Sequence, residues 1–141
     1  MYYTEKDKKD GRDGDVQTMR KHKREESLQM LISEVSELLN QTENEQLVWH
    51  GSQTDLMEAL HTAYLFGNLH NDQGQPCTFK EIVNHACRLF AHPVPSNPTA
   101  LASRGRYRKG VKRQSFFDRY CLLQSHGKGC RPLLQSVSKA P

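Results

Sequence analysis

The sequence predicts a mainly α-helical protein, in which a tri-helical, winged-helix-like domain follows an upstream amphipathic helix. Three observations predict this class. Apolar residues recur at helical spacing over residues 24–41, four later segments each begin with a helix-capping residue, and a short apolar run precedes those segments. A strand followed by short helices, the third of them rich in arginine, is typical of winged-helix DNA-binding domains.

The amphipathic helix is expected over residues 24–42, behind a tail over residues 1–23. The tail has mixed charge and almost no aliphatic side chains, so it has no apolar face to bury. In the helix, the apolar residues follow the spacing of a single stripe. They are Leu28, Leu31, Ile32, Val35, Leu38 and Leu39. Packing within the molecule is the favoured role of this stripe. A homodimer through the 24–41 helix is the alternative, although about two and a half heptads are short for a coiled coil.

A helical domain is expected over residues 45–126, followed by a flexible tail over residues 127–141. The tail shows no clear apolar periodicity. At the start of the domain, residues 47–49 (Leu-Val-Trp) form a short apolar run that suits a strand.

Two capping motifs predict the first two helices of this domain. Ser52 followed by Asp55 resembles a capping box, and the helix after it ends at Gly67. Thr78 and Glu81 form a second capping box, and a pair of prolines ends the helix that it begins.

The next two helices begin at Asn97 and Ser115. Asn97 is a good N-cap and Pro98 a favourable first helical residue, so a helix is expected to run to near Lys109. Gly105 weakens that helix by about 1 kcal/mol relative to alanine. Ser115 caps a further helix with four inward-facing side chains, those of Phe116, Phe117, Tyr120 and Leu123.

Positive charge is concentrated in the later part of the chain. Residues 1–50 hold 8 Lys and Arg against 11 Asp and Glu, whereas residues 51–141 hold 12 against 5. Six cations fall within ten residues that contain no acid: Arg104, Arg106, Arg108, Lys109, Lys112 and Arg113. Arginine binds phosphate bidentately, and the segment lacks the apolar face of a membrane-surface helix. We therefore expect these residues to bind double-stranded DNA, with a salt slope near −5 at about −0.9 per phosphate contact.

The sequence carries no pattern of a catalytic, metal or cofactor site. It has no P-loop, no G-x-S-x-G, no H-E-x-x-H and no expected pair of carboxylates on one helix face. The spacing of Cys77, Cys87, Cys121 and Cys130 matches no common zinc pattern, so plain thiols are expected. No apolar run approaches the roughly 18 residues of a membrane helix, and the N-terminal residues lack the apolar region of a signal peptide. The cytoplasm is the expected compartment, without a membrane partner.

Four pieces of the sequence occur in a recognisable order. A tryptophan, a turn of small residues and a helix occupy residues 48–63. Phe-Lys-Glu-Ile follows at residues 79–82, Arg-Tyr-Arg-Lys at 106–109 and Phe-Phe-Asp-Arg-Tyr at 116–120. Together, over about residues 46–124, they resemble the C-terminal part of the RteC family. The resemblance implies a winged-helix-like DNA-binding region in a transcriptional regulator of Bacteroides-type mobile elements. The namesake of that family controls excision of a conjugative transposon that carries tetracycline resistance.

The leading hypothesis is a DNA-binding transcriptional regulator associated with a mobile genetic element. The alternative is a non-enzymatic protein-interaction module that uses the 24–41 helix, with the basic segment as a non-specific patch. Competition separates the two hypotheses, because a regulator of this kind prefers duplex DNA to single strands and to a generic polyanion.

Overall fold

The computed structural model describes residues 16–41, 46–108, 114–125 and 130–139. These ranges contain six helices and a two-stranded sheet, which confirms the predicted mainly α-helical class. The helices are α1 (Val16–Leu39), α2 (Gln53–Gly67), α3 (Phe79–Leu89), α4 (Pro98–Arg106), α5 (Phe116–Ser125) and α6 (Pro132–Gln135). The strands are β1 (Leu47–Trp49) and β2 (Val137–Lys139).

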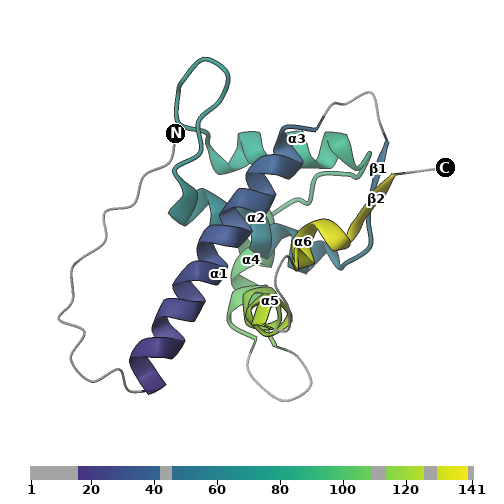
Figure 1. Ribbon diagram of the computed structural model, residues 1–141. Helices are drawn as coiled ribbons and strands as arrows, with labels where there is room; N and C mark the ends of the chain where they lie inside the picture. Colours follow the sequence, from purple (N-terminus) through teal and green to yellow (C-terminus); the bar gives the residue numbers. More distant parts are fainter. Residues whose placement is uncertain (1–15, 42–45, 109–113, 126–129, 140–141) are drawn as a thin grey trace.

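Helix α2 lies at the centre of the fold. Helices α1, α3, α4 and α5 all pack against it, and Figure 1 shows α1 crossing in front of α2. Gly67, at the end of α2, permits the close approach of α1, because a Cβ atom there would lie 2.9 Å from Ile32 Cγ2. The helix ends when Asn68 takes a left-handed conformation with φ 48°.

The apolar stripe of α1 is used inside the molecule. Leu31, Val35 and Leu38 are fully buried, and α1 packs against α2, α3, α5 and α6. This agrees with the favoured role of the stripe and leaves those three side chains unavailable as a dimer seam.

Helix α1 begins at Val16, which places residues 16–23 in a helix rather than in the predicted tail. Residues 21–23 are exposed, so no buried apolar stripe marks this part of the helix in the sequence.

Part of the predicted C-terminal tail is ordered against the core. Helix α6 buries Leu133 completely, and β2 pairs antiparallel with β1, with Trp49 opposite Val137. A four-residue helix and a three-residue strand are too short to show a period of 3.6 or 2 residues, so the sequence pattern gave no sign of them.

A buried carboxylate connects the first helix to the last two. Glu34 of α1, which is 1% exposed, accepts hydrogen bonds from the Tyr120 hydroxyl of α5 and, at 3.2 Å, from the backbone N–H of Leu134 in α6. Burial, followed by the hydrogen bond to Glu34, raises the pKa of Tyr120 far above its usual range. The phenol therefore keeps its proton near neutral pH and donates it to Glu34.

Helix α5 confirms its predicted start but not all of its predicted inward face. The Ser115 hydroxyl accepts a 3.1 Å hydrogen bond from the backbone N–H of Asp118, as expected of an N-cap. Phe116 and Tyr120 are buried, whereas Leu123 is 52% exposed. The inward position of the last turn belongs instead to Gln124, which accepts a hydrogen bond from Ser27 of α1.

Candidate nucleic-acid interface

The arginines predicted to bind DNA lie at the C-terminal end of α4. Arg104 is exposed, and it has no ion-pair partner within residues 16–41, 46–108, 114–125 and 130–139. Arg106 and Arg108 are half-buried. The other three predicted residues, Lys109, Lys112 and Arg113, lie outside the described residues.

Helix α4 is held against α2 by a close backbone approach. Gly105 is buried at the crossing, and a Cβ atom on it would lie 2.8 Å from Glu58 Oε1 and 3.0 Å from Thr54 Cγ2. The start of α4 matches the prediction, because the Asn97 side chain accepts a hydrogen bond from Ala100 N and Pro98 follows the cap. Helix α4 ends at Arg106, before the predicted end near Lys109.

Arg106 turns inward and contacts a buried histidine. Its Nη2 atom lies 3.0 Å from Nδ1 of His61, which is 9% exposed. Burial, and then the nearby Arg106 charge, lowers the pKa of His61. His61 is therefore neutral near pH 7. Because a guanidinium can only donate, Nδ1 is the accepting nitrogen, and the ring proton sits on Nε2. Arg106 is thus engaged inside the protein rather than held out to a ligand.

Arg108 belongs to a three-residue ion cluster. Asp55 Oδ1 lies 3.7 Å from Arg108 Nη1 and 2.5 Å from Arg119 Nη2 of α5. The side chain of Asp55 is 9% exposed and that of Arg108 is 22% exposed. Sequence reasoning assigned Asp55 to a helix cap and found few acids near the basic segment. The backbone N–H of Asp55 does bond to Ser52 Oγ, but its carboxylate is used by the two arginines.

Glu58, one turn later on the same face of α2, holds the start of α5. Its Oε1 atom accepts a 2.9 Å hydrogen bond from the backbone N–H of Phe116, and its Oε2 atom accepts another of 2.9 Å from Phe117. These two N–H groups have no partner within the helix, and a negative charge at a helix N-terminus is favourable. Burial raises the pKa of Glu58 in spite of these bonds.

Sequence reasoning missed this pair of carboxylates. It expected no pair on one helix face, yet Asp55 and Glu58 are three residues apart and share the face of α2 that meets α4 and α5. The available signal was two acids inside an otherwise apolar helix, because a carboxylate in such a place needs partners from elsewhere in the chain.

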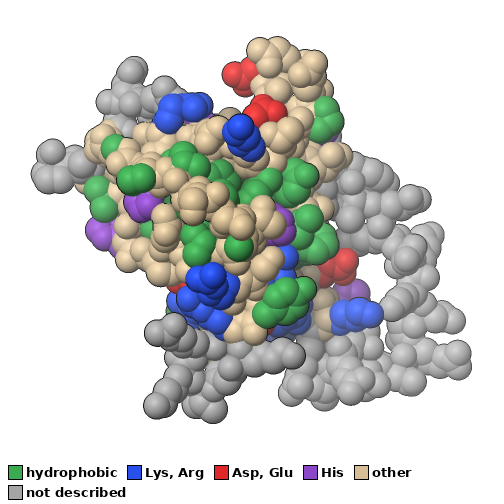
Figure 2. Space-filling model, turned by 180° about the vertical axis from the view of Figure 1, so that it is seen from behind, with side chains coloured by type: hydrophobic (Ala, Val, Ile, Leu, Met, Phe, Trp, Pro, Cys, Tyr) green, Lys and Arg blue, Asp and Glu red, His purple; other side chains and the backbone are tan. Residues whose placement is uncertain are grey.

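The exposed part of this region combines charge with an aromatic ring. Tyr107, which follows α4, is 70% exposed and lies three residues after Arg104. Figure 2 shows a group of Lys and Arg side chains at the lower edge of the rear face, below an area of hydrophobic side chains. An exposed arginine can bind a phosphate, and the hydroxyl of an exposed tyrosine can donate a hydrogen bond to a neighbouring one.

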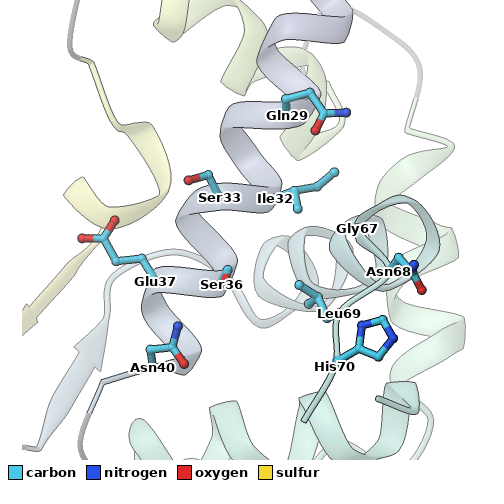
Figure 3. Close-up of a pocket in the computed structure, with 10 residues that line it drawn as sticks. All are labelled: Gln29, Ile32, Ser33, Ser36, Glu37, Asn40, Gly67, Asn68, Leu69 and His70. Atoms are coloured by element: carbon cyan, nitrogen blue, oxygen red, sulfur yellow. The ribbon is translucent and has the colours of Figure 1, made fainter. Parts of the chain in front are cut away.

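A shallow polar groove of about 580 Å³ lies between α1 and the chain that follows α2, lined by Ser33, Ser36, Asn40, Asn68 and others (Figure 3). Among the described residues, no three His, Cys, Asp or Glu side chains are grouped to hold a metal ion. No described helix is both long and apolar enough to cross a membrane.

Comparisons with family models, with curated proteins and with solved structures find no match to this chain. The resemblance to the RteC family therefore stays a prediction.

Proposed function

We propose that this chain is a non-enzymatic, cytoplasmic DNA-binding regulator associated with a mobile genetic element, and that the end of α4 is part of its DNA interface. The observation that supports the proposal most is the position of Arg104 and Tyr107. Both side chains are exposed at one end of the helix, while the opposite face of α4 packs on α2. This arrangement presents a cation and an aromatic ring next to the sequence that carries Lys109, Lys112 and Arg113.

The arrangement of elements also suits the winged-helix interpretation. A strand precedes the three helices α2, α3 and α4, and the arginine-rich helix is the third of them, which is the recognition helix in this type of domain. The partner of β1 is β2, which follows α6. In this proposal the β1–β2 ribbon takes the place of the wing.

Direct binding to duplex DNA tests the proposal. The probe is the duplex that the full chain enriches from a random pool, and a scrambled duplex of the same composition is the control. In fluorescence anisotropy, the full chain is expected to prefer the enriched duplex, with an affinity that falls as salt rises. Equal weak binding to both duplexes, lost together with salt, would leave only an electrostatic patch.

A pair of matched variants locates the interface. Arg104→Ala is expected to reduce the magnitude of the salt slope by about 0.9, the value of one phosphate contact. Lys80→Ala removes an equal charge from an exposed position in the first turn of α3. Lys80→Ala is expected to leave the slope unchanged. If both variants change the slope equally, the end of α4 is not the interface.

A further inference from the structure

One face of α2 holds the elements on both sides of the basic segment. The end of α4 is held through Arg106 on His61 and Arg108 near Asp55. The start of α5 is held through Arg119 on Asp55 and through the N–H groups of Phe116 and Phe117 on Glu58. Two carboxylates from one turn of α2 are thus shared between the two helices that flank residues 109–113.

The two carboxylates are nearly shielded from water, although their arginine partners are partly exposed. Asp55 and Glu58 are both buried, and in the described residues no buried side-chain nitrogen or oxygen lacks a hydrogen-bond partner. Gly105 brings the α4 backbone against Glu58, so the same carboxylate touches α4 on one side and caps α5 on the other. Ion pairs and hydrogen bonds of this kind have strict geometry and fix the relative position of the groups they join.

From this geometry we infer that Asp55 and Glu58 are positioning residues for DNA recognition. They set α4 and α5 relative to one another, and Asp55 holds Arg108 away from the DNA, as His61 holds Arg106. The inference rests on the proposed function. It divides the predicted basic cluster into two kinds of residue. Arg104 contacts phosphate, whereas Arg106 and Arg108 support the interface from inside.

Neutralising Asp55 distinguishes two roles for its carboxylate. It could act only by repelling the DNA, or it could position the residues that recognise the DNA. An acid that merely lies near DNA repels it, so Asp55→Asn would then tighten binding to every duplex. A positioning residue has the reverse effect on recognition. We expect Asp55→Asn to lower the ratio of enriched to scrambled duplex affinity about tenfold, the size of one lost base contact, while scrambled-duplex affinity stays equal or rises.

Asp118→Asn is the matched control. It removes the same charge from the first turn of α5, where Asp118 pairs with Arg24 on the surface. The control is expected to leave the ratio of affinities unchanged. Asp55→Glu keeps the charge, and its ratio of enriched to scrambled duplex affinity is expected to lie between those of Asp55→Asn and the unmodified protein. A role in stability alone predicts a lower midpoint of thermal unfolding with an unchanged ratio in protein that is still folded.

Arg108→Ala covers the case in which an Asp55 variant does not fold. Its side chain is partly exposed, and its removal leaves the Asp55–Arg119 pair in place. The expected result is a lower ratio with an unchanged salt slope, unlike Arg104→Ala, which changes the slope.

Two outcomes would overturn the positioning role while DNA binding stands. Either Asp55→Asn behaves as Asp118→Asn does, or Arg108→Ala lowers the magnitude of the salt slope by a full phosphate contact. If the unmodified chain shows no preference between the duplexes, both the proposed function and the positioning role fail.

Discussion

At the scale of the residue, Gly105 sets how closely α4 can approach α2. Seen only as a glycine inside a helix, it weakens α4. In the structure, the absence of a side chain lets the α4 backbone lie close to α2. A Cβ atom on Gly105 would be only 2.8 Å from Glu58 Oε1 and 3.0 Å from Thr54 Cγ2. The same residue therefore has an unfavourable local effect and a favourable effect on packing.

Gly105→Ala tests which of these effects is larger. Helix propensity alone predicts a gain of about 1 kcal/mol in the free energy of unfolding. We expect the opposite, a net loss of about 1–3 kcal/mol, because the added methyl group would force two helices apart. Urea unfolding measures the difference. Ser103→Ala, on the same helix, is the control and is expected to change stability little. A stabilised Gly105→Ala variant would show that the crossing is looser than described.

His61 makes the stability of the protein sensitive to acid. Its pKa in the folded protein lies below its ordinary value because the ring is buried and Arg106 is close. As pH falls below about 6.5, the ordinary pKa of histidine, the unfolded chain takes up a proton that the folded chain does not. This residue therefore contributes a loss of stability from about pH 6.5 downward, until the pH reaches its folded pKa.

The contribution of His61 can be isolated by comparison with a variant. Urea unfolding at several pH values between about 5 and 7.5 is expected to show a shallower decline for His61→Gln than for the unmodified protein. His70→Gln, at an exposed position, is expected to follow the unmodified protein. Identical pH dependence in all three proteins would rule out His61 as the source of the decline.

At the scale of the element, α4 is a helix with two kinds of arginine. Capping residues predicted its start, because the Asn97–Pro98 signal is local and depends only on neighbouring backbone groups. The direction of each arginine could not be predicted in the same way. Arg106 and Arg108 find His61 and Asp55, which lie far away in the sequence, and a one-dimensional charge count cannot show that pairing.

The division of the arginines changes the expected salt dependence of DNA binding. Six phosphate contacts give a slope near −5. If Arg106 and Arg108 stay inside, four contacts remain and the slope is about −3.6, at about −0.9 per contact. Anisotropy titrations over a range of salt concentrations measure this value with the enriched duplex. A slope of −5 or steeper would mean that the inward arginines, or others outside the cluster, reach the DNA.

At the scale of the whole molecule, long-range contacts with α2 and α1 organise the fold. The mainly helical class and most helix starts follow from the sequence, because period and capping are local properties. The central place of α2, the partner of β1 and the roles of the buried carboxylates do not. Each depends on residues such as Glu58 and Phe116, which meet only after the chain has folded.

The bond between Tyr120 and Glu34 tests this long-range organisation. Tyr120→Phe keeps the ring but removes the hydroxyl donor from a carboxylate that is 1% exposed. We expect a loss of about 1–3 kcal/mol in the free energy of unfolding, because a buried acceptor is left with one partner fewer. Urea unfolding measures it. Tyr64→Phe changes the same group at an exposed position of α2 and is expected to cost little. Equal small effects would show that water replaces the hydroxyl.

The pairing of β1 with β2 also affects the order in which the protein can be completed during translation. Strand β1 and the buried Glu34 receive their partners from β2 and from Leu134, which the ribosome makes many residues later. Until those residues emerge, α1 lacks the cover of α6 and the edge of β1 is open to other chains. A nascent chain that stalls before residue 130 therefore leaves this face of α1 and the edge of β1 exposed to chaperones and proteases.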